Sequence, residues 1–107
     1  MRKGTIVLVP FPFTDLSGQK IRPALVLHDS KRSEDCIVSF ISSRNEEKHG
    51  LFELKVPMSE YNGLKTDSLV RVNKIATLQK KMILGGLGEL EKKYMDGVDE
   101  LLRKLFF

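Results

Sequence analysis

The side chain best placed for chemistry in this sequence is Arg22, which follows a polar loop and directly precedes Pro23. Apolar residues before the loop and after Pro23 indicate two strands, so Arg22 is expected where the chain passes from an exposed loop into a buried sheet. A guanidinium donates two hydrogen bonds to one phosphate or carboxylate and keeps its charge. The stretch predicts an anion-binding arginine at the mouth of a hairpin, and a solvated arginine or one paired with Asp15 is the structural alternative.

Three later residues have side chains that could act beside this arginine. Ser42 ends a third apolar run, and Arg71 and Asn73 alternate within a further strand, which predicts that they point to the same face. Ser42 is equally suited to capping a loop backbone group, and Arg71 with Asn73 to the polar outer face of a sheet. Only the distances in the folded chain distinguish these roles.

Metal chemistry is not expected from this sequence. His28, His49 and Cys36 are scattered and make a poor ligand set. Cys36 is the only cysteine, which excludes an internal disulfide and favours a role in filling the core. The glycines at 85, 86 and 88 lack the lysine and helix start of a phosphate-binding loop, and they are expected to relieve a bend in a sheet.

Length and composition favour one small soluble domain. The 107 residues form one domain over residues 1–107, since two separate cores would be too small to be stable. No apolar run reaches the roughly 20 residues that span a bilayer, and the start lacks a signal-peptide cleavage site, so a cytoplasmic protein without a membrane segment is expected. The net charge of +4 is compatible with a polyanionic partner.

The elements that would position these side chains follow from hydrophobic periodicity. Apolar or alternating runs predict strands at residues 5–10, 23–28, 36–41, 52–56, 68–75 and 83–88, with a short helical turn near residues 59–61. From residue 89 the apolar residues recur at helical spacing. The pattern predicts a mainly β protein with a C-terminal helix, built as a compact antiparallel barrel or a strongly bent sheet.

The order of these segments resembles the MazF/PemK family of toxin endoribonucleases over nearly the whole chain. The segments that carry the resemblance are GTIVLVPFPFTDLSGQKIRPALVL, IVSFISS and DSLVRVNKIATL. The resemblance implies a small SH3-like barrel of antiparallel strands that forms a homodimer, cleaves single-stranded RNA without metal or other cofactor, and is silenced by an acidic antitoxin.

The resemblance also assigns roles to residues. The catalytic arginine of the family's Arg-Pro motif falls on Arg22, and its strand-end hydroxyl falls on Ser42. Gln19, Arg71 and Asn73 are possible catalytic or RNA-binding residues, although Gln19 and Asn73 carry amides where relatives have carboxylates.

Three further residues are candidate RNA contacts. They are Lys20, Arg44 and Phe13, the last as an aromatic on which a base could stack. Two other functions stay open: a CcdB-like, non-enzymatic gyrase poison with the same barrel, and a catalytically weakened member that still binds RNA or an antitoxin.

Overall fold

A computed structural model describes residues 1–11, 20–43 and 50–107 of the chain. Its elements, in chain order, are β1 (Thr5–Phe11), β2 (Lys20–Asp29), β3 (Asp35–Ser42), β4 (Glu53–Val56), β5 (Ser68–Gln79), the 3-10 turn η1 (Lys80–Met82), β6 (Gly85–Glu89) and α1 (Lys92–Phe106). The strands and the C-terminal helix expected from periodicity are present, but α1 begins later than expected because Glu89 is still paired with Thr5 in the sheet.

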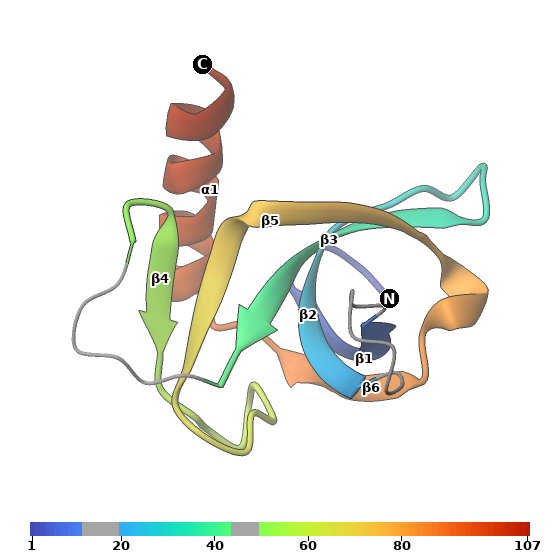
Figure 1. The fold of residues 1–107 in the computed structure, drawn as a ribbon, viewed down its shortest axis with the longest axis horizontal. Helices are drawn as coiled ribbons and strands as arrows, with labels where there is room; N and C mark the ends of the chain where they lie inside the picture. The colour runs from blue at the N-terminus through green and yellow to red at the C-terminus, as the bar shows by residue number, and fades with distance from the viewer. Residues whose placement is uncertain (12–19, 44–49) are drawn as a thin grey trace.

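The strands form one six-stranded sheet in the order β4-β5-β3-β2-β1-β6, and every neighbouring pair is antiparallel. Figure 1 shows this sheet curling from β5 through β3, β2 and β1 round to β6, with α1 standing beside β4 and β5. The prediction of a mainly antiparallel, strongly bent sheet with one covering helix is confirmed.

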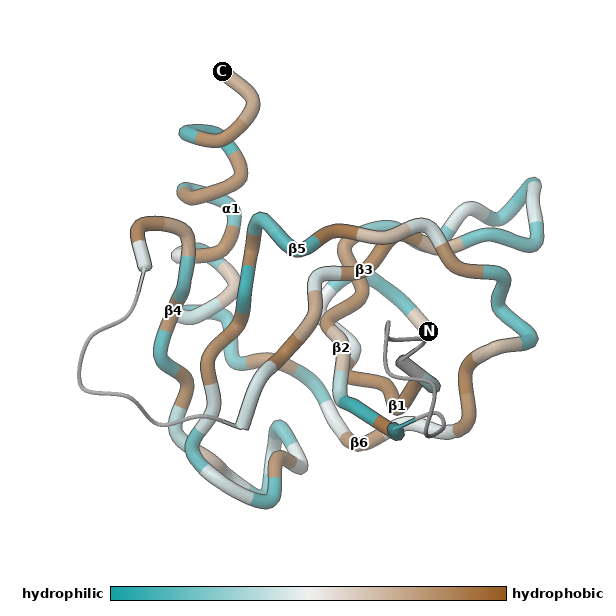
Figure 2. Tube along the Cα trace, in the orientation of Figure 1, coloured by the Kyte–Doolittle hydropathy of each residue, from teal (hydrophilic) through white to brown (hydrophobic). Residues whose placement is uncertain are grey.

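Alternation along the strands divides the core into two apolar clusters. In β2, Leu25 and Leu27 belong to the cluster beneath α1, and Ala24 and Val26 belong to the cluster on the opposite face. Val98 of α1 is fully buried in the first cluster, and Figure 2 shows hydrophobic and hydrophilic residues alternating along the helix. The helix therefore covers one face of the sheet near β4 and β5, and leaves the other face for a site.

The prediction that the lone cysteine fills the core is confirmed. Cys36 is buried in the second cluster, where burial raises the pKa of its thiol. Among the described residues, no helix combines the length and the apolarity needed to cross a bilayer.

The start of β2 corrects the expected position of Arg22. The strand begins at Lys20, so Arg22 and Pro23 lie within it and pair with Val9 and Leu8 of β1. A proline is tolerated at position 23 because β2 pairs with β3 only from Ala24 onward. No backbone carbonyl of β3 therefore needs the N–H that proline lacks.

The connection between β4 and β5 is held by the side chain of Asn62, which is fully buried. Its amide nitrogen donates to Pro57 O and Glu91 Oε1, and its oxygen accepts from Ser59 N and Leu64 N, all at 3.0 Å. The expected helical turn is present only as a turn, and the left-handed residue is Gly63, with φ of 71°.

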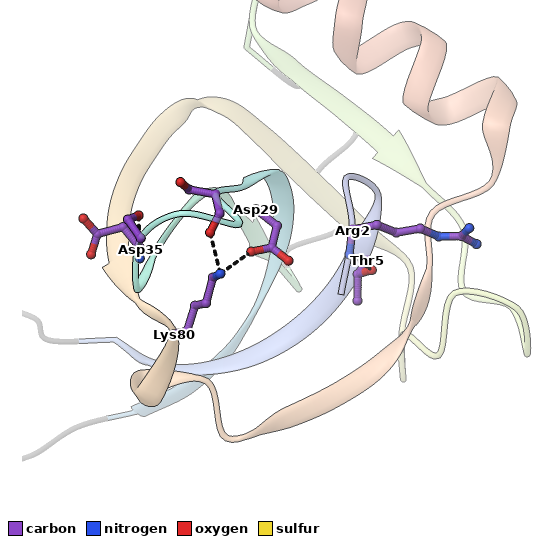
Figure 3. Close-up of polar contacts among 7 residues, drawn as sticks. Arg2, Thr5, Asp29, Asp35 and Lys80 are labelled. Carbon is purple, nitrogen blue, oxygen red and sulfur yellow. Dashed lines mark hydrogen bonds and ion pairs between the residues drawn. The ribbon is translucent and has the colours of Figure 1, made fainter.

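Lys80, at the start of η1, joins the end of β5 to the turn that follows β2. Its Nζ lies 2.7 Å from Asp29 Oδ1 and donates to the carbonyl of Ser30 at 2.6 Å, as Figure 3 shows for the Asp29 contact. The contact with Lys80 lowers the pKa of Asp29. This pairing ties the turn between β2 and β3 to the end of β5.

Candidate active site

The strand register places Arg22 and Ser42 on one face of the sheet. Strands β2 and β3 pair Val26 with Val38 and Ala24 with Phe40. The pairing of these two strands ends at Ala24 and Phe40, and by alternation Arg22 lies on the face of Ala24 and Ser42, the last residue of β3, lies on the face of Phe40. Arg22 and Ser42 therefore both lie on the face of the sheet opposite α1, beyond the last pair that joins β2 to β3.

Arg22 is half-buried, and it makes no side-chain hydrogen bond or ion pair with residues 1–11, 20–43 or 50–107. It lies on the same face as Ala24 and Val26, which anchor the strand in the second cluster. The backbone is thus held by the sheet while the guanidinium stays partly accessible. The alternative partner, Asp15, lies outside the described residues.

Arg71 of β5 lies on this same face of the sheet. Its partner in β3 is two residues before Ser42. Arg71 is paired with Phe40 of β3 on one side and with Glu53 of β4 on the other. Because Ser42 is paired with Leu69, Arg71 is its diagonal neighbour, within reach of a long side chain. Arg71 Nε lies 3.2 Å from Glu53 Oε2, an ion pair without hydrogen-bond geometry.

A bulge in β5 separates Asn73 from Arg71. The register with β3 shifts between Ser39, which faces Ile75, and Phe40, which faces Arg71. The bulge is secured by the buried hydroxyl of Ser39, which donates to the carbonyl of Val72 at 3.1 Å. Asn73 falls inside the bulge, is exposed and has no strand partner among the described residues.

The other predicted site residues fall into two groups. Lys20 is exposed at the start of β2, two residues before Arg22 and therefore on its face. Three of them lie outside the described residues: Phe13, Gln19 and Arg44. The described part of the candidate site is therefore one face of the sheet that carries Lys20, Arg22, Arg71 and Ser42 near the strand ends.

No group of three or more His, Cys, Asp or Glu side chains in the described ranges is arranged to hold a metal ion. His28 is exposed in β2, and His49 lies outside the described residues. What the described face offers is positive charge and a hydroxyl donor, which suit the stabilisation of a charged phosphate.

Two residues escaped the sequence reasoning: Glu53, which lies on this face, and Ser39, which lies on the opposite face and bonds to β5. Glu53 looked like the solvent side of a half-buried strand, and Ser39 like part of an apolar run. The alternation of Glu53 with Leu54 did indicate its face, but nothing local indicated that its neighbour would be Arg71. For Ser39, a hydroxyl in the middle of a buried strand was a usable signal, since it needs a partner.

Comparison with known proteins decides the family. A family model described as PemK-like, MazF-like toxin of type II toxin-antitoxin system matches residues 2–106. The chain belongs to this family of toxins. No curated protein matches it.

Solved structures of family members share the fold at low sequence identity. A MazE-MazF crystal structure from Deinococcus radiodurans aligns over 98% of this chain and 94% of its own, with 21% identity and a TM-score of 0.79. The Mycobacterium tuberculosis toxin MazF-mt6 covers 95% of each chain at 21% identity and a TM-score of 0.74. A mycobacterial endoribonuclease in complex with its cognate antitoxin covers 97% and 92% at 18% identity and a TM-score of 0.75.

Proposed function

We propose that this toxin is a metal-independent, sequence-specific endoribonuclease that cleaves single-stranded RNA, with Arg22 and Ser42 as its catalytic residues. The observation that supports the proposal is that alternation along β2 and β3 puts Arg22 and Ser42 on the same face of the sheet, opposite α1. Membership of a toxin family supports it, as does the similarity to chains described as endoribonucleases. No observation favours the gyrase-poison alternative.

The reaction requires charge stabilisation more than a bound metal. The 2′-hydroxyl of the RNA attacks the adjacent phosphorus, and the bond to the 5′-oxygen breaks, which leaves a 2′,3′-cyclic phosphate and a 5′-hydroxyl. Negative charge grows on the non-bridging oxygens in the transition state. Arg22 neutralises that charge through two parallel donors, and Ser42 donates one hydrogen bond to the same oxygens.

Three assembly features belong to the proposal. The toxin acts in the cytoplasm. It acts there as a homodimer, because one chain of 34 × 32 × 30 Å offers only a short cationic face for a long RNA. Its inhibitor is an antitoxin with an acidic, partly disordered segment that lies over Arg22. Carboxylates readily occupy a cationic site built for phosphates, and a segment that folds on binding can cover a large surface.

Single-turnover cleavage of one long unstructured RNA, with and without chelator, tests the catalytic pair. Arg22→Ala should abolish cleavage, and Arg22→Lys should restore little, since an ammonium lacks the two-point geometry. Ser42→Ala should cost on the order of 10²-fold, the effect of one preorganised donor, and Ser42→Thr should be tolerated. Chelator should change none of these rates.

The matched control is Arg32→Ala, which removes an exposed arginine from the turn beyond the other end of β2. It should cleave like the wild type, and all variants should keep the wild-type melting temperature. Full activity in a folded Arg22→Ala protein would overturn this mechanism.

A further inference from the structure

Glu53 contacts two parts of the candidate site through its two carboxylate oxygens. Oε2 lies 3.2 Å from Arg71 Nε, and Oε1 accepts a hydrogen bond of 2.6 Å from the backbone N–H of Gly50. The backbone N–H of Glu53 in turn donates to the carbonyl of Gly50 at 3.1 Å. The turn that precedes β4 thus holds the carboxylate of Glu53 in one orientation, and this orientation directs Oε2 to the arginine.

The Arg71–Glu53 contact is more enclosed than an ordinary surface ion pair. The side chains are only 33% and 20% exposed, and Arg71 Nε itself is buried. Cross-strand pairing of Glu53 with Arg71 fixes both backbones and holds the two side chains directly opposite each other. Ser39, through the carbonyl of Val72, fixes the β5 bulge beside it.

Glu53 contacts Nε of Arg71, and this contact leaves the two terminal amino groups of the guanidinium for a phosphate. A guanidinium carries five N–H donors in a planar fork, of which Nε supplies one and the two terminal amino groups supply four. With Nε held against Glu53, the terminal amino groups stay available for two-point binding of a phosphate. Rotation of the guanidinium away from that arrangement would break the contact with Glu53.

We propose that Glu53 is a positioning residue that clamps the guanidinium of Arg71 at Nε, so that its terminal amino groups bind the RNA phosphate next to Ser42. This inference rests on the proposed function, and it assigns a role to a carboxylate of β4 that the sequence alone did not single out. Glu53 does not touch the substrate: its effect passes through Arg71.

Glu53→Gln is the informative variant, because it keeps the size of the side chain and an oxygen for the Gly50 N–H but removes the charge. We expect the single-turnover rate at saturating RNA to fall roughly 10- to 10²-fold, since small displacements of a positioned group have effects of that size. The RNA concentration at half-maximal rate should change much less. Glu100→Gln, which removes an exposed helix carboxylate paired with Lys104 at 3.7 Å, is the matched control and should leave both quantities unchanged.

A double-mutant cycle separates positioning from a general loss of structure. In an Arg71→Ala background, Glu53→Gln should slow cleavage no further, because its only route to the substrate has been removed. Rates are compared below the melting temperature of every variant, so a lower stability does not imitate the effect. Glu53→Gln cleaving like Glu100→Gln, or rate losses that multiply in the double mutant, would overturn the positioning role. A wild-type protein inactive on RNA would instead overturn the proposed function, and this role with it.

Discussion

At the scale of single residues, most charged side chains that are not fully exposed have a specific partner. Lys80 is held by Asp29, and Arg71 by Glu53. Arg22 is half-buried and has no such partner among the described residues, although burying a charge without one is costly. In the proposed function, the anionic substrate is the partner of this guanidinium.

Glu91, the residue just before α1, shows how hydrogen bonds set the charge of a carboxylate. Its partial burial opposes ionisation, but hydrogen bonds from the backbone, Ser59 and Asn62 outweigh that effect and lower the pKa of Glu91. The ionised carboxylate therefore joins the start of the helix to the connection between β4 and β5.

This lowered pKa predicts an acid-dependent loss of stability. Above pH 4.5, the ordinary pKa of this carboxyl group, Glu91 is ionised in both the folded and the unfolded chain, and its full contribution is present. As the pH falls below that value the unfolded chain takes up the proton first, so the free energy of unfolding falls until the folded pKa has been passed. Urea unfolding between about pH 6 and about pH 3 should show a steeper loss for the wild type than for Glu91→Gln.

Glu100→Gln serves as the control for that titration, because it removes a carboxylate that is 65% exposed. Its pH profile should follow that of the wild type. If Glu91→Gln also followed the wild type, the ionised network at the helix start would contribute nothing to stability.

At the scale of elements, β6 depends on a close approach to the connection between β4 and β5. A Cβ at Gly88 would lie 2.4 Å from the carbonyl oxygen of Tyr61, whereas a Cβ at Gly86 would meet nothing within 4 Å. Beside that contact, Glu89 N donates to Tyr61 O at 3.1 Å. The glycines expected to relieve a bend therefore have different roles, and Gly88 admits the backbone of a neighbouring segment.

Gly88→Ala should consequently lower the free energy of unfolding by about 1–3 kcal/mol, the usual effect of forcing an extra methyl group into a packed site. Gly86→Ala, the same change two residues away on the same strand, should stay within about 0.5 kcal/mol of the wild type. Thermal or urea unfolding of the two variants measures the difference. Equal stabilities would mean that the segment at Tyr61 moves aside without cost.

At the scale of the whole molecule, the fold separates stability from the candidate chemistry. The helix and the larger apolar cluster occupy one face of the sheet. The other face carries the second apolar cluster, with the cationic strand ends and Ser42 at its edge. Changes at the candidate site should therefore affect activity more than folding.

Light scattering at micromolar concentration should give twice the mass of the 12.2 kDa chain. The reason is that two copies related by a twofold axis join their short cationic faces into one longer RNA-binding surface. Binding of the antitoxin should then protect the backbone around Arg22 from hydrogen exchange. A monomer in solution would remove the dimer from the proposal, and an exposed Arg22 in the inhibited complex would remove the proposed position of the antitoxin segment.

Features that depend on neighbouring residues can be predicted from the sequence, whereas features that depend on contacts between distant strands cannot. Alternation at residues such as Ala24 and Leu25 predicts strands and their two faces, because successive side chains of a strand point in opposite directions. The helical spacing of Tyr94, Val98 and Leu101 likewise predicts the C-terminal helix. The arginine before Pro23 and the hydroxyl at the end of β3 are also visible locally, although Arg22 lies further inside its strand than expected.

Only the tertiary structure decides which strands are neighbours and in what register. Glu53 and Arg71 are far apart in the sequence and meet because β4 pairs with β5, and the bulge beside Ser39 leaves Asn73 without a partner in β3. Register is chosen by packing of the whole buried face, since a slip of one residue would turn every side chain of a strand to the wrong side. The sequence thus specifies which side chains each face can hold, and the packing of distant strands determines which of them act together.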